Sequence, residues 1–331
     1  MNTRIKLLTQ VRSKLLLTIF VFAVVWFGNC TKNANQEASK DGGDSQSVVV
    51  SNAAWKKVVE SLNFPEGPAW NEHERSLCFS NCYGGWITRL AHGQVDTFLT
   101  AHSSPFTFEK TNGMTFHNGH LFACDFGVGA ILKISPGGKT EIYASTFEGK
   151  AFNRPNDLTF DGNGSLYFTD PKSYSREVLD GRVFCVRAQD KTIIQLADSL
   201  GFPNGIAFSN DGKQLYVCES AFERILRFDV QAEGRLRNKQ VFVELPGGDP
   251  DGIDFDREGN LYAAHFGGGA VYVIAPDGSI RQKIPAPGKK PTNIEFGGDD
   301  LKTLFLTEVE TSALYQCRVE IAGTAALVVN K

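Results

Sequence analysis

A unit of about 45 residues recurs six times along this chain of 331 residues, and this repeat constrains the fold more than any other feature. In each copy a polar or glycine-rich turn leads into a short apolar segment that contains a leucine. The six leucines follow one another at intervals of 43 to 49 residues and are Leu77, Leu121, Leu166, Leu215, Leu261 and Leu304. A period of this length is typical of proteins built from one repeated supersecondary unit.

Each repeat predicts four antiparallel strands. The second copy shows four apolar segments, at 113–116, 121–124, 130–135 and 140–144, and turns such as 161–164 and 210–212 have the composition of hairpin turns. Helical periodicity is absent. We therefore expect an all-β fold, a six-bladed β-propeller with four antiparallel strands per blade, that spans residues 54–331 as one domain. Residues 55–60 are predicted to complete blade six and close the ring, and residues 325–330 compete for that place.

The first 53 residues have the composition of an export signal and a linker. Residues 1–29 place four basic residues before an apolar stretch at 15–27, as in a signal peptide. Cys30 follows directly and resembles the lipidated cysteine of a bacterial lipobox, and residues 30–53 read as a flexible tether. We expect an exported protein of the bacterial periplasm or cell envelope that meets the membrane only through a lipid anchor on Cys30. Ordinary cleavage or a retained anchor is the alternative.

The six remaining cysteines are interpreted as small buried side chains within strands. An even number in an exported chain also fits disulfides, but Cys78 and Cys82 would lie about 13 Å apart along an extended strand, which is too far for a bond.

The net charge argues against nucleic acid as a partner. The formal net charge is −3, and the body beyond the basic N-terminus is more acidic still. We therefore expect no nucleic-acid partner.

A first set of polar residues occurs once per repeat, at the start of each predicted innermost strand. The six residues of this first ring are Glu66, Asn112, Asn156, Asn204, Asp251 and Asn293. Glycine directly follows four of them. Innermost strands line the central channel of a propeller, so one register from six blades forms a ring that offers oxygen atoms. A second polar set stands four residues after each repeat leucine: Asn81, Asp125, Asp170, Glu219, His265 and Glu308. Antiparallel pairing predicts that the second ring lies beside the first, as a second layer or as the pocket rim.

The first ring suits a hard cation. Two carboxylates and several amide oxygens are the ligands that Ca²⁺ prefers, and the ring holds neither the histidine nor the cysteine that Zn²⁺ favours. The alternative is that these polar residues are only solvated turn positions, which explains a single Asn-Gly better than it explains two complete rings. We find no serine or cysteine nucleophile in a plausible local context.

Five segments resemble the SMP-30/gluconolactonase family, and they occur in the family's order. They are EGPAW (66–70), TNGMTFHNGHLFACDFG (111–127), NRPNDLTFDGNGSLYFTDP (153–171), FPNGIAFSNDGKQLYV (202–217) and PDGIDFDREGNLYAAHFGGG (250–269). The resemblance covers about residues 60–316. It implies a six-bladed propeller that carries a divalent cation in its channel: Ca²⁺, or Mg²⁺, Mn²⁺ or Zn²⁺ in its place.

The resemblance also implies roles for single residues. The metal ligands would be Glu66, Asn156, Asn204 and Asp251, and Arg154 would contact the substrate. Together with the ring chemistry, this predicts a hydrolase of small cyclic esters such as sugar lactones, in which the metal polarises the carbonyl and Asp251 is the general base. Asn112, His265 and Asn293 are further candidates for substrate contacts, and a structural hydrogen bond is the alternative for His265. Asp125, Asp170, Glu219 and Glu308 are candidates for a second layer around the metal.

Two other functions fit the same ring. A phosphotriesterase or arylesterase would differ only in the lining of the pocket. A non-enzymatic propeller at the cell surface would bind a glycan or a protein and use its calcium structurally, with the ligands buried and no coordination position open to solvent. A monomer is expected for a closed propeller.

Overall fold

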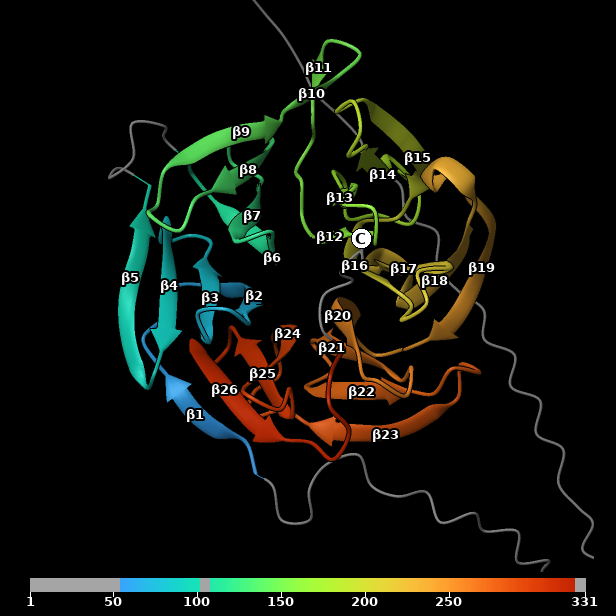
Figure 1. Ribbon diagram of the computed structural model, residues 1–331. Coiled ribbons are helices and arrows are strands. Elements are labelled where there is room, and N and C mark those ends of the chain that lie inside the picture. Colours follow the sequence, from blue (N-terminus) through green and yellow to red (C-terminus); the bar gives the residue numbers. More distant parts are fainter. Residues whose placement is uncertain (1–53, 102–107, 325–331) are drawn as a thin grey trace, which may run out of the picture. The chain divides into compact units, whose positions relative to one another are not determined.

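Six four-stranded antiparallel sheets are arranged around a central channel in this computed structural model, which describes residues 54–101 and 108–324 (Figure 1). The expected all-β six-bladed propeller is therefore confirmed. The predicted signal peptide, tether and lipidated Cys30, and the competing segment 325–330, lie outside the described residues. No helix within the described residues is long and apolar enough to cross a membrane.

Within blades one to five the strands follow the chain from the channel outward, and in blade six the outermost strand is the N-terminal strand of the described residues. Blade one contains β2 (Pro65–Asn71), β3 (Ser76–Asn81), β4 (Trp86–Ala91) and β5 (Gln94–Thr100). Blade two contains β6 (Thr111–His117), β7 (His120–Asp125), β8 (Ala130–Ile134) and β9 (Thr140–Ala144). Blade three contains β12 (Leu158–Phe160), β13 (Leu166–Asp170), β14 (Gly181–Val186) and β15 (Ile193–Leu200).

The second half of the ring repeats this order. Blade four contains β16 (Pro203–Phe208), β17 (Gln214–Glu219), β18 (Arg224–Val230) and β19 (Leu236–Glu244). Blade five contains β20 (Asp249–Phe255), β21 (Leu261–Phe266), β22 (Ala270–Ile274) and β23 (Ile280–Pro285). Blade six contains β24 (Pro291–Gly297), β25 (Thr303–Glu308), β26 (Ala313–Arg318) and β1 (Lys56–Val59). The hairpin of β10 (Thr146–Phe147) and β11 (Lys150–Ala151) lies between blades two and three.

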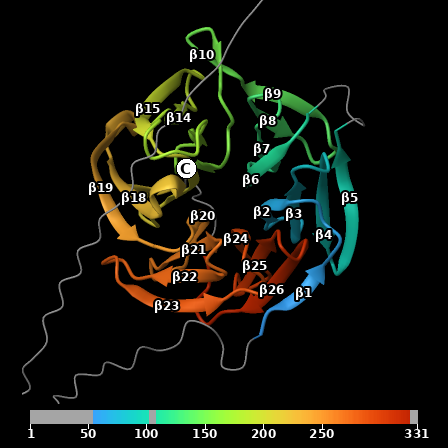
Figure 2. The ribbon, with the colours of Figure 1, turned by 180° about the vertical axis from the view of Figure 1, so that it is seen from behind.

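The ring is closed by the N-terminal strand, as predicted. β1 pairs with β26 in antiparallel register, with Lys56 opposite Gln316 and Lys57 opposite Tyr315. A backbone hydrogen bond from Leu62 to the carbonyl of Ser312 (3.0 Å) continues this link. Figure 2 shows β1 at the outer edge of blade six, beside blade one. One sheet thus holds both ends of the propeller, so the ring cannot open without breaking strand pairing.

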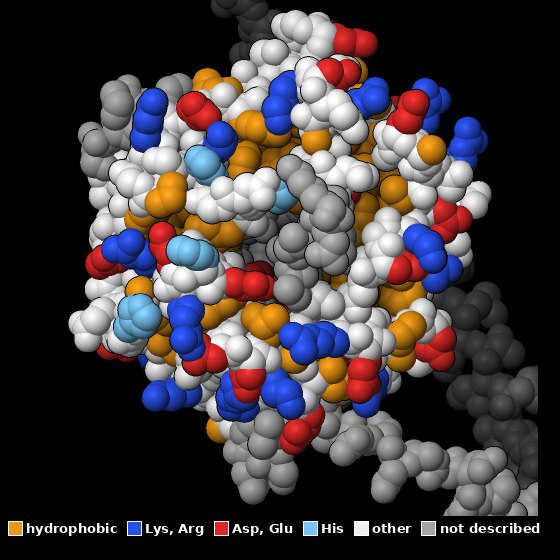
Figure 3. Space-filling view, viewed as in Figure 1, with side chains coloured by type: hydrophobic (Ala, Val, Ile, Leu, Met, Phe, Trp, Pro, Cys, Tyr) orange, Lys and Arg blue, Asp and Glu red, His pale blue; other side chains and the backbone are white. Residues whose placement is uncertain are grey.

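The hydrophobic core is divided into six clusters, each between two neighbouring blades. All six repeat leucines are at most 1% exposed, so the repeat found in the sequence is the repeat of the core. The cysteines at 78, 82, 124, 185, 218 and 317 are buried with free thiols. All but Cys82, which follows the end of β3, lie within strands, as interpreted from the sequence. On the face seen in Figure 3, basic and acidic side chains alternate around the periphery.

Candidate functional site

The four expected metal ligands line one pocket. Glu66, Asn156, Asn204 and Asp251 come from blades one, three, four and five and face a cavity of about 190 Å³ at the end of the channel where the innermost strands begin. Glu66, Asn204 and Asp251 are 5 to 8% exposed. Asn112 of blade two also lines this pocket, as does Arg154. One register of the repeat therefore converges as expected.

In five of the six blades a bulge lies at the ring residue, near the start of the innermost strand. Strand pairing shifts register directly after Glu66 in β2, and the same shift occurs at the equivalent points of β6, β16, β20 and β24. A β-bulge bends its strand and redirects a side chain, and bulges are frequent beside active sites. In these five blades the bulge, rather than simple strand alternation, explains why the ring residue points inward.

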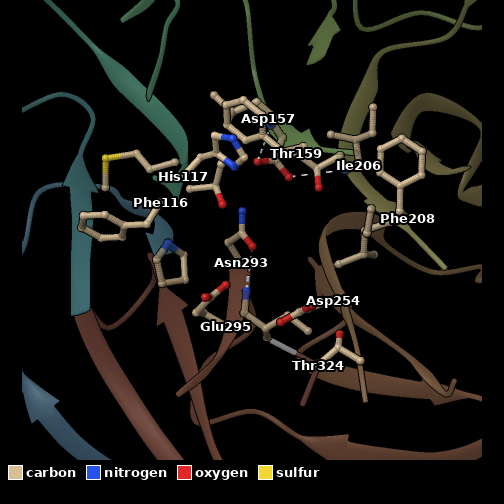
Figure 4. Close-up of a pocket in the computed structure, with 18 residues that line it drawn as sticks. Phe116, His117, Asp157, Thr159, Ile206, Phe208, Asp254, Asn293, Glu295 and Thr324 are labelled. Carbon is tan, nitrogen blue, oxygen red and sulfur yellow. Dashed lines mark hydrogen bonds between the residues drawn. The ribbon is translucent and has the colours of Figure 1, made fainter. Parts of the chain in front are cut away.

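The predicted ring was wrong by one residue in blade six. Pro65, Pro203 and Pro250 pair with the second-ring residues Asn81, Glu219 and His265, and Pro291 pairs with Glu308 in the same way. The residue after Pro291 is Thr292, so Thr292 occupies the ring position. Asn293 instead lines a separate pocket farther along the channel, as Figure 4 shows. The expected substrate contact of Asn293 therefore lies away from the candidate site.

Glycine follows the ring residue because neighbouring innermost strands touch there. A Cβ atom at Gly67 would overlap the carbonyl oxygen of Asn112, and one at Gly205 would overlap the carbonyl oxygen of Asp251. Only glycine permits so close an approach of two backbones. The hydroxyl of Thr169 in blade three donates to the carbonyl oxygen of Asn204 in blade four (2.7 Å) and fixes the spacing of the two blades.

The two carboxylates of the first ring, Glu66 and Asp251, repel each other. Burial, and to a smaller extent the charge of Asp157, raises the pKa of Glu66 to about 8, although the Gly67 N–H (3.2 Å from Oε2) favours the charged form. Burial and the charge of Glu66 raise the pKa of Asp251 well above its usual range. A cation between the two groups would reverse this penalty, since an opposite charge stabilises the ionised forms.

This donor set fits a hard cation. Two carboxylates and two amide oxygens from four blades match the oxygen preference of Ca²⁺. The described residues contain no group of three or more His, Cys, Asp or Glu side chains placed to hold a metal. The candidate site is consistent with that finding because two of its four ligands are asparagines.

The second ring lies behind the first and ties down the loops that enter the innermost strands. Asp125 accepts hydrogen bonds from the backbone of Glu109 (2.7 Å) and Lys110 (3.0 Å), and Asp170 accepts them from Asn153 and Arg154. The equivalent bonds in blades one, four and six run from Asn63 to Asn81, from Gly201 to Glu219 and from Lys290 to Glu308. All these acceptor residues are at most 2% exposed. They therefore act on the pocket through the backbone that carries it.

His265 is turned away from the pocket, contrary to the predicted role in proton transfer or substrate binding. Its Nε2 donates to the carbonyl oxygen of Leu245 (2.7 Å), and the residue is 1% exposed. Burial lowers the pKa of its imidazole. The structural alternative for His265 is the one that this geometry favours.

The sequence analysis missed the aromatic wall above the ring. Six aromatic residues line the pocket: Phe64, Tyr83, Phe126, Tyr174, Phe202 and Phe266. Part of this wall had a signal, because Phe126 and Phe266 directly follow the second-ring residues Asp125 and His265. Phe64 and Phe202 occupy equivalent positions two residues before Glu66 and Asn204.

Two potential nucleophiles beside the pocket are poorly suited to attack. Cys82 is buried, which raises the pKa of its thiol well above the usual range. The hydroxyl of Ser220 donates to the carbonyl oxygen of Pro250 (2.8 Å). A third carboxylate that lines the pocket, Asp249, accepts a hydrogen bond from the Tyr174 hydroxyl. Among the described residues that line this pocket, Glu66 and Asp251 are therefore the best placed to assist the attack of water.

Comparison with known proteins places the chain among propeller hydrolases. The family model described as SMP-30/Gluconolactonase/LRE-like region matches residues 64–310. Diisopropyl-fluorophosphatase of Loligo vulgaris is 33% identical over 212 residues, which are 59% of this chain and 67% of that protein. Gluconolactonase of Zymomonas mobilis is 32% identical over 282 residues, 76% of this chain and 77% of its own. The solved structure of a gluconolactonase from Xanthomonas campestris superposes with a TM-score of 0.72 at 28% identity and covers 82% of this chain and 91% of that one.

Proposed function

The chain belongs to the SMP-30/gluconolactonase/LRE-like family, and we propose that it is a metal-dependent hydrolase of small cyclic esters. Its relatives named gluconolactonase, and the pentonolactonase of Haloferax volcanii, support the class of an ester-hydrolysing lactonase. The single observation that carries the proposal is the convergence of two buried carboxylates and two amide side chains from four blades on one open pocket. A purely structural ion would need no such opening.

Glu66, Asn156, Asn204 and Asp251 would hold the cation, with Ca²⁺ the best match to the ligand set. When bound, this cation supplies Lewis-acid polarisation of the ester carbonyl and stabilises the negative charge that develops there. The chain's own residues supply the remaining chemistry. Arg154 and Asn112 line the same pocket and are proposed to orient the substrate.

Asp251 is proposed as the general base. Its carboxylate takes a proton from water while the water oxygen bonds to the carbonyl carbon. The ring C–O bond then breaks, the proton passes from Asp251 to the leaving oxygen, and the product is the open hydroxy acid. The neighbouring Asn204 amide favours the charged form of Asp251. A charged carboxylate can accept a proton in the transition state.

The test is hydrolysis of a panel of γ- and δ-lactones by the purified full-length chain. We expect turnover that falls at least about 100-fold when a chelator removes the metal and that returns when Ca²⁺ is added. Activity insensitive to chelator would contradict the metal-dependent mechanism. Absence of hydrolysis across the panel would instead favour the non-enzymatic propeller with a structural ion.

A phosphotriesterase activity at the same site is the second candidate, because a relative named Diisopropyl-fluorophosphatase is 33% identical to this chain. The same protein assayed on a chromogenic phosphotriester distinguishes the two. We expect the lactone to be the better substrate by kcat/KM, and the reverse order would replace the first proposal with the second.

A further inference from the structure

Aromatic side chains make up much of the lining of the candidate pocket, around the polar ring. The six aromatic residues that line it come from five blades, and Tyr83 and Tyr174 are 55% and 57% exposed. Large aromatic side chains gathered on an exposed concave surface indicate a binding site for an apolar group. The polar ring at the bottom of the same pocket is where the ester would react.

The rings on one side of the pocket form a continuous surface. Phe64 meets Tyr83 edge to face, with ring centroids 4.9 Å apart, and Tyr83 meets Phe126 in the same way at 6.3 Å. The guanidinium of Arg154 lies 5.3 Å from the centroid of Phe126. Contacts of this kind hold aromatic side chains in place, so the wall is organised before a ligand arrives.

Two of the phenylalanines adopt a backbone conformation that bulky residues rarely use. Phe64 has φ of 56° and Phe202 has φ of 58°, both in the left-handed region. Such a conformation is unfavourable for a phenylalanine and persists only where the surrounding structure imposes it. Each of these phenylalanines directly precedes the proline before a ring residue, Glu66 or Asn204. The strained backbone therefore lies between an aromatic residue of the wall and a polar residue of the ring.

Besides the ring residues, the polar residues that line the pocket are Arg154, Ser220 and Asp249 together with two tyrosines, and several of these already have partners. The hydroxyl of Tyr174 donates to Oδ1 of Asp249 (2.6 Å), and that of Ser220 donates to a backbone carbonyl. A substrate with several hydroxyl groups would lose hydrogen bonds to water here and recover few from the protein, which is costly. An aryl or alkyl substituent would instead exchange water for contact with rings.

From this wall we infer that the preferred substrates are lactones or esters with a flat apolar substituent, and not polyhydroxylated sugar lactones. The inference rests on the proposed hydrolase function and assigns its substrate class. The ester group lies over the polar ring, and the substituent packs against Tyr83 and Phe126. Hydrolysis proceeds as written above, with water adding to the carbonyl carbon and the ring C–O bond breaking.

Three γ-lactones with the same reacting ring test the inference: γ-phenyl-γ-butyrolactone, unsubstituted γ-butyrolactone and ribono-1,4-lactone. We expect kcat/KM for the phenyl compound to exceed both others by at least about 10-fold. Phe126→Ala should remove most of this preference, because it lowers kcat/KM for the phenyl compound far more than kcat/KM for unsubstituted γ-butyrolactone. Phe98→Ala is the matched control, because Phe98 lies on the outer strand β5 and does not line the pocket.

A binding measurement separates this inference from the proposed function. Calorimetric titration with 5-phenyl-2-pyrrolidinone, a lactam analogue, does not depend on turnover. We expect binding that Phe126→Ala weakens at least about 10-fold and Phe98→Ala leaves unchanged. Lactam binding without lactone hydrolysis would overturn the hydrolase and keep the pocket specificity. A preference for ribono-1,4-lactone, or binding unaffected by Phe126→Ala, would overturn the inference and leave the hydrolase standing.

Discussion

The two ends of the central channel both hold buried carboxylates, but these have different partners. At the end with the candidate site, Glu66 accepts one backbone hydrogen bond, from its own neighbour Gly67. At the opposite end, in the pocket of about 140 Å³ drawn in Figure 4, the carboxylates accept hydrogen bonds from the next blade. Asp254 accepts from Phe296 (3.3 Å), and Glu295 accepts from Trp70 (3.0 Å).

This difference separates a carboxylate that is available for chemistry from one that holds the ring together. The hydrogen bond from the backbone N–H of Trp70 to Glu295 joins blade one to blade six. The hydrogen bond from the backbone N–H of Ile206 to Asp157 joins blade four to blade three. Burial raises the pKa at both ends, and it raises that of Asp157 to about 7. The shift alone therefore does not identify the functional group; the hydrogen-bond partners do.

The largest expected effect is on activity at the candidate site. Asp251→Asn keeps the size and one oxygen of the side chain but removes the base, so we expect kcat to fall at least about 100-fold with the fold retained. Steady-state kinetics and circular dichroism measure the two quantities. Near-normal turnover would refute the role of Asp251 and remove the distinction between the two ends.

The next effect is on stability at the opposite end. Glu295→Ala leaves the Trp70 N–H without its acceptor, whereas Glu295→Gln keeps an acceptor and removes the charge that repels Asp254. We expect the alanine variant to be less stable than the glutamine variant by about 1–3 kcal/mol in urea denaturation. Both should keep kcat/KM within about threefold of wild type, because neither touches the candidate site. A large loss of activity in Glu295→Gln would show that the far end takes part in function.

The smallest effect is on the pH dependence of stability. Burial, with a contribution from the charges of Asp157 and Asp256, raises the pKa of Asp254 to about 7, against the backbone N–H groups of Phe255 and Phe296, which lower it. Since the folded state then binds its proton more tightly than the unfolded state, this group makes stability fall as pH rises from about 4 to about 7.

Asp254→Asn should remove this contribution, so the decline of Tm across that range becomes shallower than in wild type. Both proteins are compared metal-free, with Glu66 and Asp251 unchanged as the internal control. Parallel Tm profiles for the two proteins would mean that Asp254 does not titrate in that range.

Much of the fold followed from the sequence because the repeat leucines are core positions, and a core repeats when the blade does. The ring was predicted for the same reason, since one register per blade meets at the axis. Asn293 was assigned to the ring because asparagine occupies that position in other blades. The proline before the ring residue marks the position more reliably: the ring residue directly follows Pro65, Pro155, Pro203, Pro250 and Pro291. His265 was misassigned because residue type does not reveal which way a buried side chain points.

The aromatic wall was out of reach for a different reason. Phe64 and Phe202 face the pocket from loops and have a left-handed backbone conformation themselves. Glycine, the usual sequence signal of that conformation, is absent at both positions. Tyr83 and Tyr174 lie beyond the ends of their strands, where strand periodicity no longer predicts direction. The sequence therefore indicated the reacting groups better than the surface that selects the substrate.

The most direct test of the central claim is an anomalous-diffraction experiment on crystals of the protein grown with Mn²⁺, which substitutes for Ca²⁺ at oxygen sites. We predict an anomalous peak among the side-chain oxygens of Glu66, Asn156, Asn204 and Asp251, lost in the Glu66→Ala variant. A map without a peak at that position, in crystals where these four side chains are ordered, would contradict the account.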